Sequence, residues 1–181
     1  LYPFGGFEDE IGEGAGRGYN VNFPLPEETD DELYNAVFQA VVMPLLEAYR
    51  PDGIVAVVGV DTLAPDPLAH LSLTNNAVER SLRRLARLRV PVLALGGGGY
   101  TMDAAARAWA LGWAALAGLE VGEVQPGLGG RFLGNPDLGG AGLRDMHVVI
   151  GGEVRRRNVA ECIRVEAALK ELVFPILGAP T

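Results

Sequence analysis

Cysteine and lysine are nearly absent from this chain of 181 residues, in which Cys162 and Lys170 are the only ones of their kinds. A single cysteine excludes an intramolecular disulfide and any CxxC metal or redox motif. Positive charge is also scarce, and the net charge of −8 argues against a nucleic-acid or anionic-membrane partner. The longest uncharged helix-like run, residues 108–119, is too short to span a bilayer. No signal-peptide pattern opens the chain, so we expect a cytoplasmic globular protein.

Apolar residues, 49% of the chain, alternate between strand-like and helix-like patterns. Two short apolar runs, residues 54–60 and 90–95, are typical of strands buried on both faces of a parallel sheet. A brief extended piece is expected at residues 147–150. Helices are predicted over residues 30–49, 75–89, 102–117 and 157–172. Strands that alternate with helices predict an α/β fold, with a parallel sheet flanked by helices.

Local signals mark where the helices and loops should begin and end. Residues 29–32 have the S/T-x-x-E spacing of a capping box, with Thr29 as the cap. Pro44 should kink or split the helix that follows. Thr74 or Asn75 should cap the second helix, and Thr101 the third. Asp66, between two prolines, is expected to cap the loop that contains it.

Four consecutive glycines, Gly96 to Gly99, separate the second strand from Tyr100 and a helix. They could bind phosphate, but a dinucleotide loop would need a third glycine where Thr101 stands. They could instead let the backbone pass close to a narrow ligand, with the phenol at a fixed depth. Carboxyl ends of neighbouring parallel strands share one edge of a sheet, so we expect Asp61 and Tyr100 on a common rim.

Three blocks of sequence carry a resemblance: "GEGAGRGYNVNFPLP", "VGVDTLAPDPLAHLSLT" and "LALGGGGYTMDAAARAW". In this order and at these separations, they are similar to the C-terminal half of a histone deacetylase-like catalytic domain, of the bacterial acetoin-utilization type. The resemblance implies a three-layer αβα arrangement of the arginase/deacetylase fold, here incomplete. Residues 1–181 would be part of one domain, with strong resemblance over 1–117, a glycine-rich connection at 118–145 and a terminal strand and helix at 146–181.

The resemblance also implies a set of site residues. In that family, zinc is held by two aspartates and a histidine, and Asp61 matches the last of these ligands. Tyr100 matches the catalytic tyrosine that donates its hydroxyl to the developing oxyanion. The passage for the acyl chain would be lined by Gly97, Gly98 and Gly99, with Tyr2 as an aromatic wall. The main chain at Tyr19 matches a contact to an alkali cation, potassium or sodium.

The activity implied is zinc-dependent hydrolysis of an acetylated lysine or of a small acetylated amine. The other ligands, a D-x-H set, and a tandem pair of histidine bases belong to the family's N-terminal half. Neither His70 nor His147 is expected to belong to such a pair or to a D-x-H set. The chain starts at Leu1 rather than Met, as a fragment would, so we expect it to be inactive alone. Its sheet edge would be covered by the N-terminal half or by another chain. The alternative is a non-catalytic binding module or decayed paralogue without a complete metal site.

Overall fold

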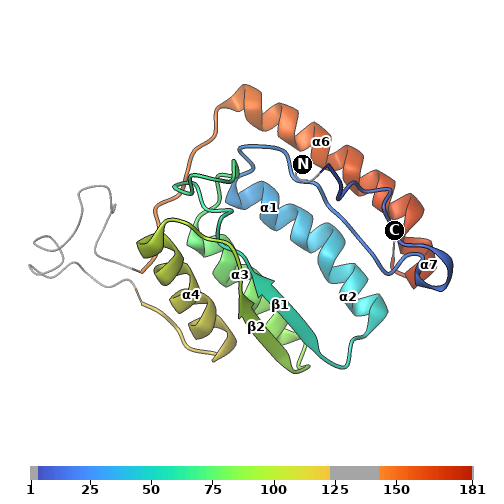
Figure 1. Ribbon diagram of the computed structural model, residues 1–181, viewed down its shortest axis with the longest axis horizontal. Coiled ribbons are helices and arrows are strands. Elements are labelled where there is room, and N and C mark those ends of the chain that lie inside the picture. Colours follow the sequence, from blue (N-terminus) through green and yellow to red (C-terminus); the bar gives the residue numbers. More distant parts are fainter. Residues whose placement is uncertain (1–3, 123–142, 181) are drawn as a thin grey trace, which may run out of the picture. The chain divides into compact units, whose positions relative to one another are not determined.

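The computed structural model describes residues 4–122 and 143–180, and the chain divides into two compact units (Figure 1). One unit comprises residues 1–51 and 150–181, and the other comprises residues 52–149. Asp61 and Tyr100 both belong to the second unit. Tyr2 and most of the predicted glycine-rich connection lie outside the described residues. None of the helices in the described part of the chain combines the length and the apolarity of a bilayer-spanning segment.

The first unit is helical. Its elements are the short 3-10 helix η1 (Gly14–Gly16), α1 (Asp31–Val37), the π-helical turn η2 (Phe38–Val42), α2 (Met43–Tyr49), α6 (Gly152–Leu172) and α7 (Phe174–Leu177). Val41 and Leu45 pack with Val165, Leu169 and Phe174 in an apolar core. This core joins two segments that are far apart in the sequence, because α6 and α7 close against η2 and α2.

Pro44 shapes the first long helix as expected. The N–H of Met43 donates to the carbonyl of Phe38, five residues back, so a π-helical turn separates α1 from α2. Proline has no N–H to give to the helix, and the wider turn accommodates it. The predicted cap is wrong by one residue: Leu33 N–H donates to the carboxylate of Asp30 at 2.9 Å, while the hydroxyl of Thr29 donates to Pro26 O at 2.7 Å. Thr29 serves the preceding turn, and the charged Asp30 caps the helix.

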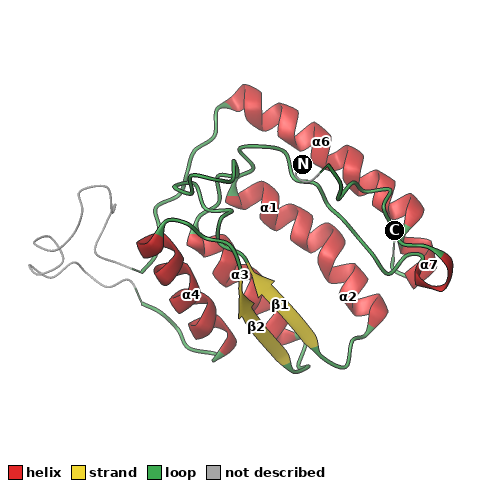
Figure 2. Cartoon of the chain, viewed as in Figure 1, coloured by secondary structure: helices red, strands yellow, loops and turns green. Residues whose placement is uncertain are grey.

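The second unit is a βαβα arrangement. Its elements are β1 (Ile54–Val58), α3 (Asn75–Arg87), β2 (Val92–Gly96) and α4 (Met102–Leu116). The two strands pair in parallel, from Ile54 beside Val92 to Val58 beside Gly96, and Figure 2 shows both arrows running the same way. The predicted α/β fold with a parallel sheet is therefore confirmed. Residues 147–150 form no strand, and the last helix begins at Gly152 rather than near residue 157.

The expectation that both faces of the β1–β2 sheet are buried is wrong. Val55 and Val57 are 64% and 69% exposed, and Leu93 and Leu95 are exposed beside them in register. Side chains alternate between the two faces of a strand, and the opposite face meets the helices: Val58 and Ala94 line an apolar pocket with Leu82 of α3, Gly112 of α4 and others. Within the second unit, the helices lie on one face of the sheet, and Val55 and Val57 of β1 lie on the other.

Candidate functional site

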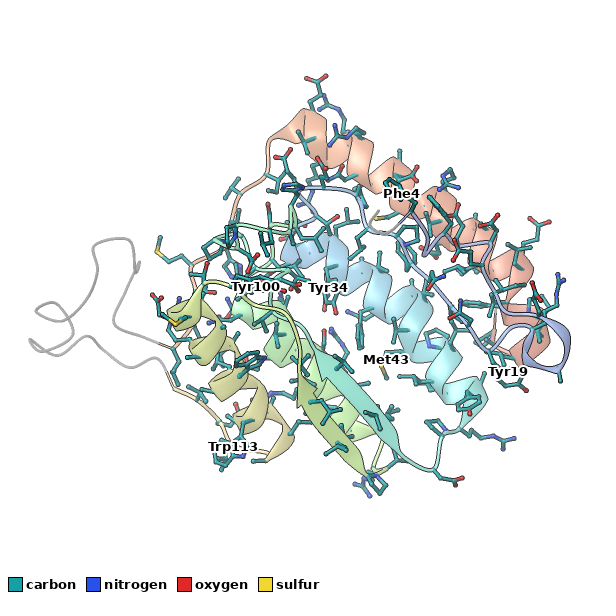
Figure 3. The ribbon with its side chains drawn as sticks, viewed as in Figure 1. Phe4, Tyr19, Tyr34, Met43, Tyr100 and Trp113 are labelled. Carbon is teal, nitrogen blue, oxygen red and sulfur yellow. The ribbon has the colours of Figure 1, made fainter. Side chains whose placement is uncertain are left out.

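The carboxyl ends of β1 and β2 bring the two predicted site residues to one edge of the sheet. Pairing continues past the strands, because Val60 N–H donates to Gly98 O at 2.7 Å. Asp61 follows Val60, Tyr100 lies two residues after Gly98, and Figure 3 shows Tyr100 beyond the ends of the two arrows. The Tyr100 residue is 56% exposed. The strand arrangement behind the common-rim prediction is confirmed, while the chemical roles of both residues stay predictions.

The glycines after β2 lie where the backbones of the two strand ends nearly touch. A Cβ at Gly97 would lie 2.7 Å from the Cα of Gly59, and a Cβ at Gly98 would lie 2.2 Å from Oδ2 of Asp61. Gly99 has φ +145° and faces a side-chain methyl of Val60. Side chains at these positions would collide with β1 and its extension. Gly97 is thus required where the two backbones approach each other, and Gly98 leaves room for the carboxylate of Asp61.

The loop between β1 and α3 is tied to the glycine segment by Asp66, which is buried. Its Oδ1 accepts N–H groups from Leu68 at 2.9 Å and Ala69 at 3.4 Å, so the predicted loop cap is confirmed. Its Oδ2 accepts the backbone N–H of Tyr100 at 2.8 Å, a link that no pattern in the sequence predicts. Thr101 occupies the cap position of α4, but its hydroxyl donates to Pro65 O at 2.8 Å and makes no capping bond. Its predicted capping role is wrong, because the loop uses the hydroxyl instead.

A zinc ion, as the resemblance implies, would find one ligand here. Gly98 leaves open the space beside the carboxylate of Asp61, and a carboxylate oxygen is a suitable zinc ligand. Among residues 4–122 and 143–180, however, no three His, Cys, Asp or Glu side chains gather as a metal site would require. Asp61 fits as a single member of a ligand set, and the others would have to come from outside the described residues.

One further pattern has the spacing of the family's metal ligands. Asp145-Met146-His147 reads D-x-H, so the expectation that His147 belongs to no such pattern is wrong. In the structure, the carboxylate of Asp145 accepts a charged hydrogen bond from Arg107 and the backbone N–H of Asn75 at 3.1 Å. Asp145 therefore closes the N-terminus of α3, where a carboxylate is favoured by the helix dipole. Both carboxylate oxygens accept hydrogen bonds within the protein rather than binding a metal.

Tyr19 lies in the first unit. Its ring packs edge-on against Tyr49 with centroids 6.0 Å apart, and its N–H donates to Gly16 O at 3.1 Å. These contacts fix the ring and the local turn. The proposed role of its main chain toward an alkali cation stays a prediction.

Fold and site together define an α/β protein with a carboxylate and a phenol on the carboxyl edge of a parallel sheet. The histone deacetylase domain model matches residues 1–116 of the 181, and the chain belongs to this family. Histone deacetylase 19 of Arabidopsis thaliana is 34% identical over 125 residues, which are 69% of this chain and 25% of that protein. Histone deacetylase 8 of Xenopus tropicalis is 33% identical over 126 residues, 70% of this chain and 34% of that protein. Human histone deacetylase 1 is 34% identical over 125 residues, which are 69% of this chain and 26% of that protein.

This chain thus spans about a quarter to a third of the length of these curated relatives. The matched residues include both strands, the glycine segment, Asp61, Asp66 and Tyr100. The relatives named here come from a plant, a frog and a human, so the finer resemblance to a bacterial acetoin-utilization type stays a prediction.

Proposed function

We propose that the protein is a zinc-dependent deacetylase that hydrolyses acetylated lysine or a small acetylated amine, and that this chain is the C-terminal part of its catalytic domain. The observation that carries the proposal is the placement of Asp61 and Tyr100 after adjacent parallel strands, at one edge of the sheet and within the family match. The cytoplasm is the compartment that we propose for this activity, on the ground of the sequence features given above.

The residues of this chain have separable roles in such a reaction. In this reaction, water adds to the acyl carbon and negative charge builds on the carbonyl oxygen. The tetrahedral intermediate then breaks its C–N bond. The amine departs with a proton from the water, and acetate is the second product. The Tyr100 hydroxyl would donate a hydrogen bond to that oxygen, where charge develops. Asp61 would hold the zinc, which when bound supplies polarisation of the acyl oxygen and of the water. The glycine segment would leave the approach to Tyr100 free of side chains.

The first test is genetic and the second kinetic. The coding sequence upstream of Leu1 should contain, in frame, a D-x-H set and a tandem histidine pair. In the protein that includes this segment, Tyr100→Phe should lower kcat for an acetyl-lysine peptide by roughly 10²–10³-fold, as the loss of an oxyanion donor does, with a smaller change in KM. Turnover close to that of the parent protein would remove Tyr100 from the mechanism.

A non-catalytic binding module is the second candidate. It is favoured by the absence, among the described residues, of three metal-binding side chains that lie together. Metal analysis after dialysis separates the two proposals. The longer protein should retain about one zinc per chain if it is the enzyme, since a catalytic zinc takes three protein ligands. The module would retain none and would hydrolyse no acetyl-lysine peptide.

A further inference from the structure

We infer that Asp66 is the positioning residue for Tyr100, since its buried carboxylate sets the place of the tyrosine backbone and hence of the phenol. This inference rests on the proposed role of Tyr100 in deacetylation. Its basis is the pair of carboxylate oxygens, which face two different parts of the chain. Oδ1 holds the turn at Leu68 and Ala69, while Oδ2 holds the N–H of Tyr100 at 2.8 Å.

The loop that carries Asp66 is itself fixed. Leu63 and Leu73 form an isolated bridge and are 1% and 2% exposed. Ala64 N–H donates to Leu73 O at 2.9 Å, and Asp66 N–H donates to Leu63 O at 2.9 Å. The carboxylate is thus held on a closed loop with a buried base. A hydrogen bond from Tyr100 to this carboxylate transfers that rigidity to the glycine segment.

Tyr100 needs such an anchor, because little else restrains it. More than half of the residue is exposed, so the packing of its ring cannot fix it. It follows four glycines, which have the greatest backbone freedom of any residue. The anchors in this segment are the bond between Val60 and Gly98, the bond from Tyr100 to Asp66, and the bond from the Thr101 hydroxyl to Pro65. Only the second acts on Tyr100 itself, and a charged acceptor makes it the stronger kind of hydrogen bond.

The experiment is a double-mutant cycle in the protein that contains the complete family domain. Asp66→Ala should lower kcat by roughly 10–10²-fold, because a small misplacement of a catalytic group costs about that much, and KM should change less. In the Tyr100→Phe background, which keeps the backbone N–H, Asp66→Ala should lower kcat by less than about 3-fold, since no hydroxyl is left to position. Asp66→Asn preserves the shape but cannot accept at both ends, so its effect should be intermediate. Asp103→Asn, which removes an exposed charge three residues from Tyr100, is the matched control.

A second measurement does not depend on turnover. Amide hydrogen exchange should be slow at Tyr100 in the parent protein and faster in Asp66→Asn, while the core of α3 stays protected. Equal losses of kcat from Asp66→Ala in both backgrounds would overturn the inference and leave the role of Tyr100 intact. Normal turnover of Tyr100→Phe would instead refute the proposed function, and the inference with it. If Asp66→Ala does not fold, the cycle is run with Asp66→Asn, and unchanged exchange at Tyr100 would also overturn the inference.

Discussion

Replacing Gly98 with alanine should damage the metal ligand while leaving the fold nearly intact. The new Cβ would lie 2.2 Å from Oδ2 and 2.7 Å from Cγ of Asp61. Heavy atoms that are not bonded prefer separations of about 3.5 Å, so the carboxylate would have to move by about 1 Å. A carboxylate at the end of a short side chain can turn aside, and the cost in unfolding free energy should stay below about 1 kcal/mol.

If Asp61 holds zinc as proposed, that movement should weaken metal binding. Zinc–oxygen distances in a bound site vary by only about 0.2 Å, so a displaced Asp61 would hold the metal poorly. We expect the zinc dissociation constant of the complete domain to rise by roughly 10–100-fold, the range seen when a ligand loses its supporting contacts. Competition with a chelating dye measures this constant, and urea denaturation of the metal-free protein measures stability.

Two glycine variants provide the comparison. Gly97→Ala places its Cβ 2.7 Å from the Cα of Gly59, which is backbone and cannot turn aside, so it should destabilise the fold by about 1–3 kcal/mol. Gly16→Ala has no atom within 4 Å of its Cβ and should change neither quantity. Parent-like zinc affinity in Gly98→Ala would refute the reasoning. A loss of stability as large as that of Gly97→Ala would show that Gly98 serves only packing.

Three further predictions concern stability and association. Burial raises the pKa of the Cys162 thiol to about 11, so the native thiol should react far more slowly than the unfolded one at pH 8. The unfolding free energy should fall between about pH 9 and 11, because only the unfolded thiol ionises in that range. A hydrogen bond from Arg144 lowers the pKa of Glu79, so the ionised carboxylate stabilises the fold above its usual pKa. This contribution should be lost progressively as pH falls from the usual pKa through the lowered one, and Glu79→Gln should flatten that part of a denaturation series. The isolated chain should self-associate through its open sheet face, and Val57→Thr, but not Val149→Thr, should weaken association in sedimentation velocity runs.

The parallel sheet could be predicted from the sequence because it depends on local patterns. Apolar runs of strand length, separated by one helix, leave few arrangements other than a parallel pair, and Asp61 and Tyr100 then fall at the same edge. The errors came from interactions between distant residues. Continuous apolar runs indicated strands buried on both faces, yet Val55 and Val57 are exposed, and the run itself does not say which elements cover a strand.

The spacing of residues in the sequence does not predict hydrogen bonds between loops. Asp66 between two prolines predicts a capped turn, and this is found, but a carboxylate has two oxygens and the turn uses one. The second bonds to Tyr100, 34 positions along the chain, and no local pattern reports that distance. Thr101 shows the same limit, because a threonine before a helix predicts a cap, whereas its hydroxyl bonds to the loop.

The sequence predicts only part of the role of the four glycines. Four glycines indicate that side chains are excluded, but the sequence does not say which atoms exclude them. The structure identifies these atoms as the backbone of Gly59 and the side chains of Val60 and Asp61, so the glycine before the acid and the glycines before the phenol belong to one close contact between two strand ends. The close approach of the two strand ends thus places the carboxylate, and together with the bond from Asp66 it places the phenol. A substitution in this contact should therefore affect the chemistry of the site even where it touches neither Asp61 nor Tyr100.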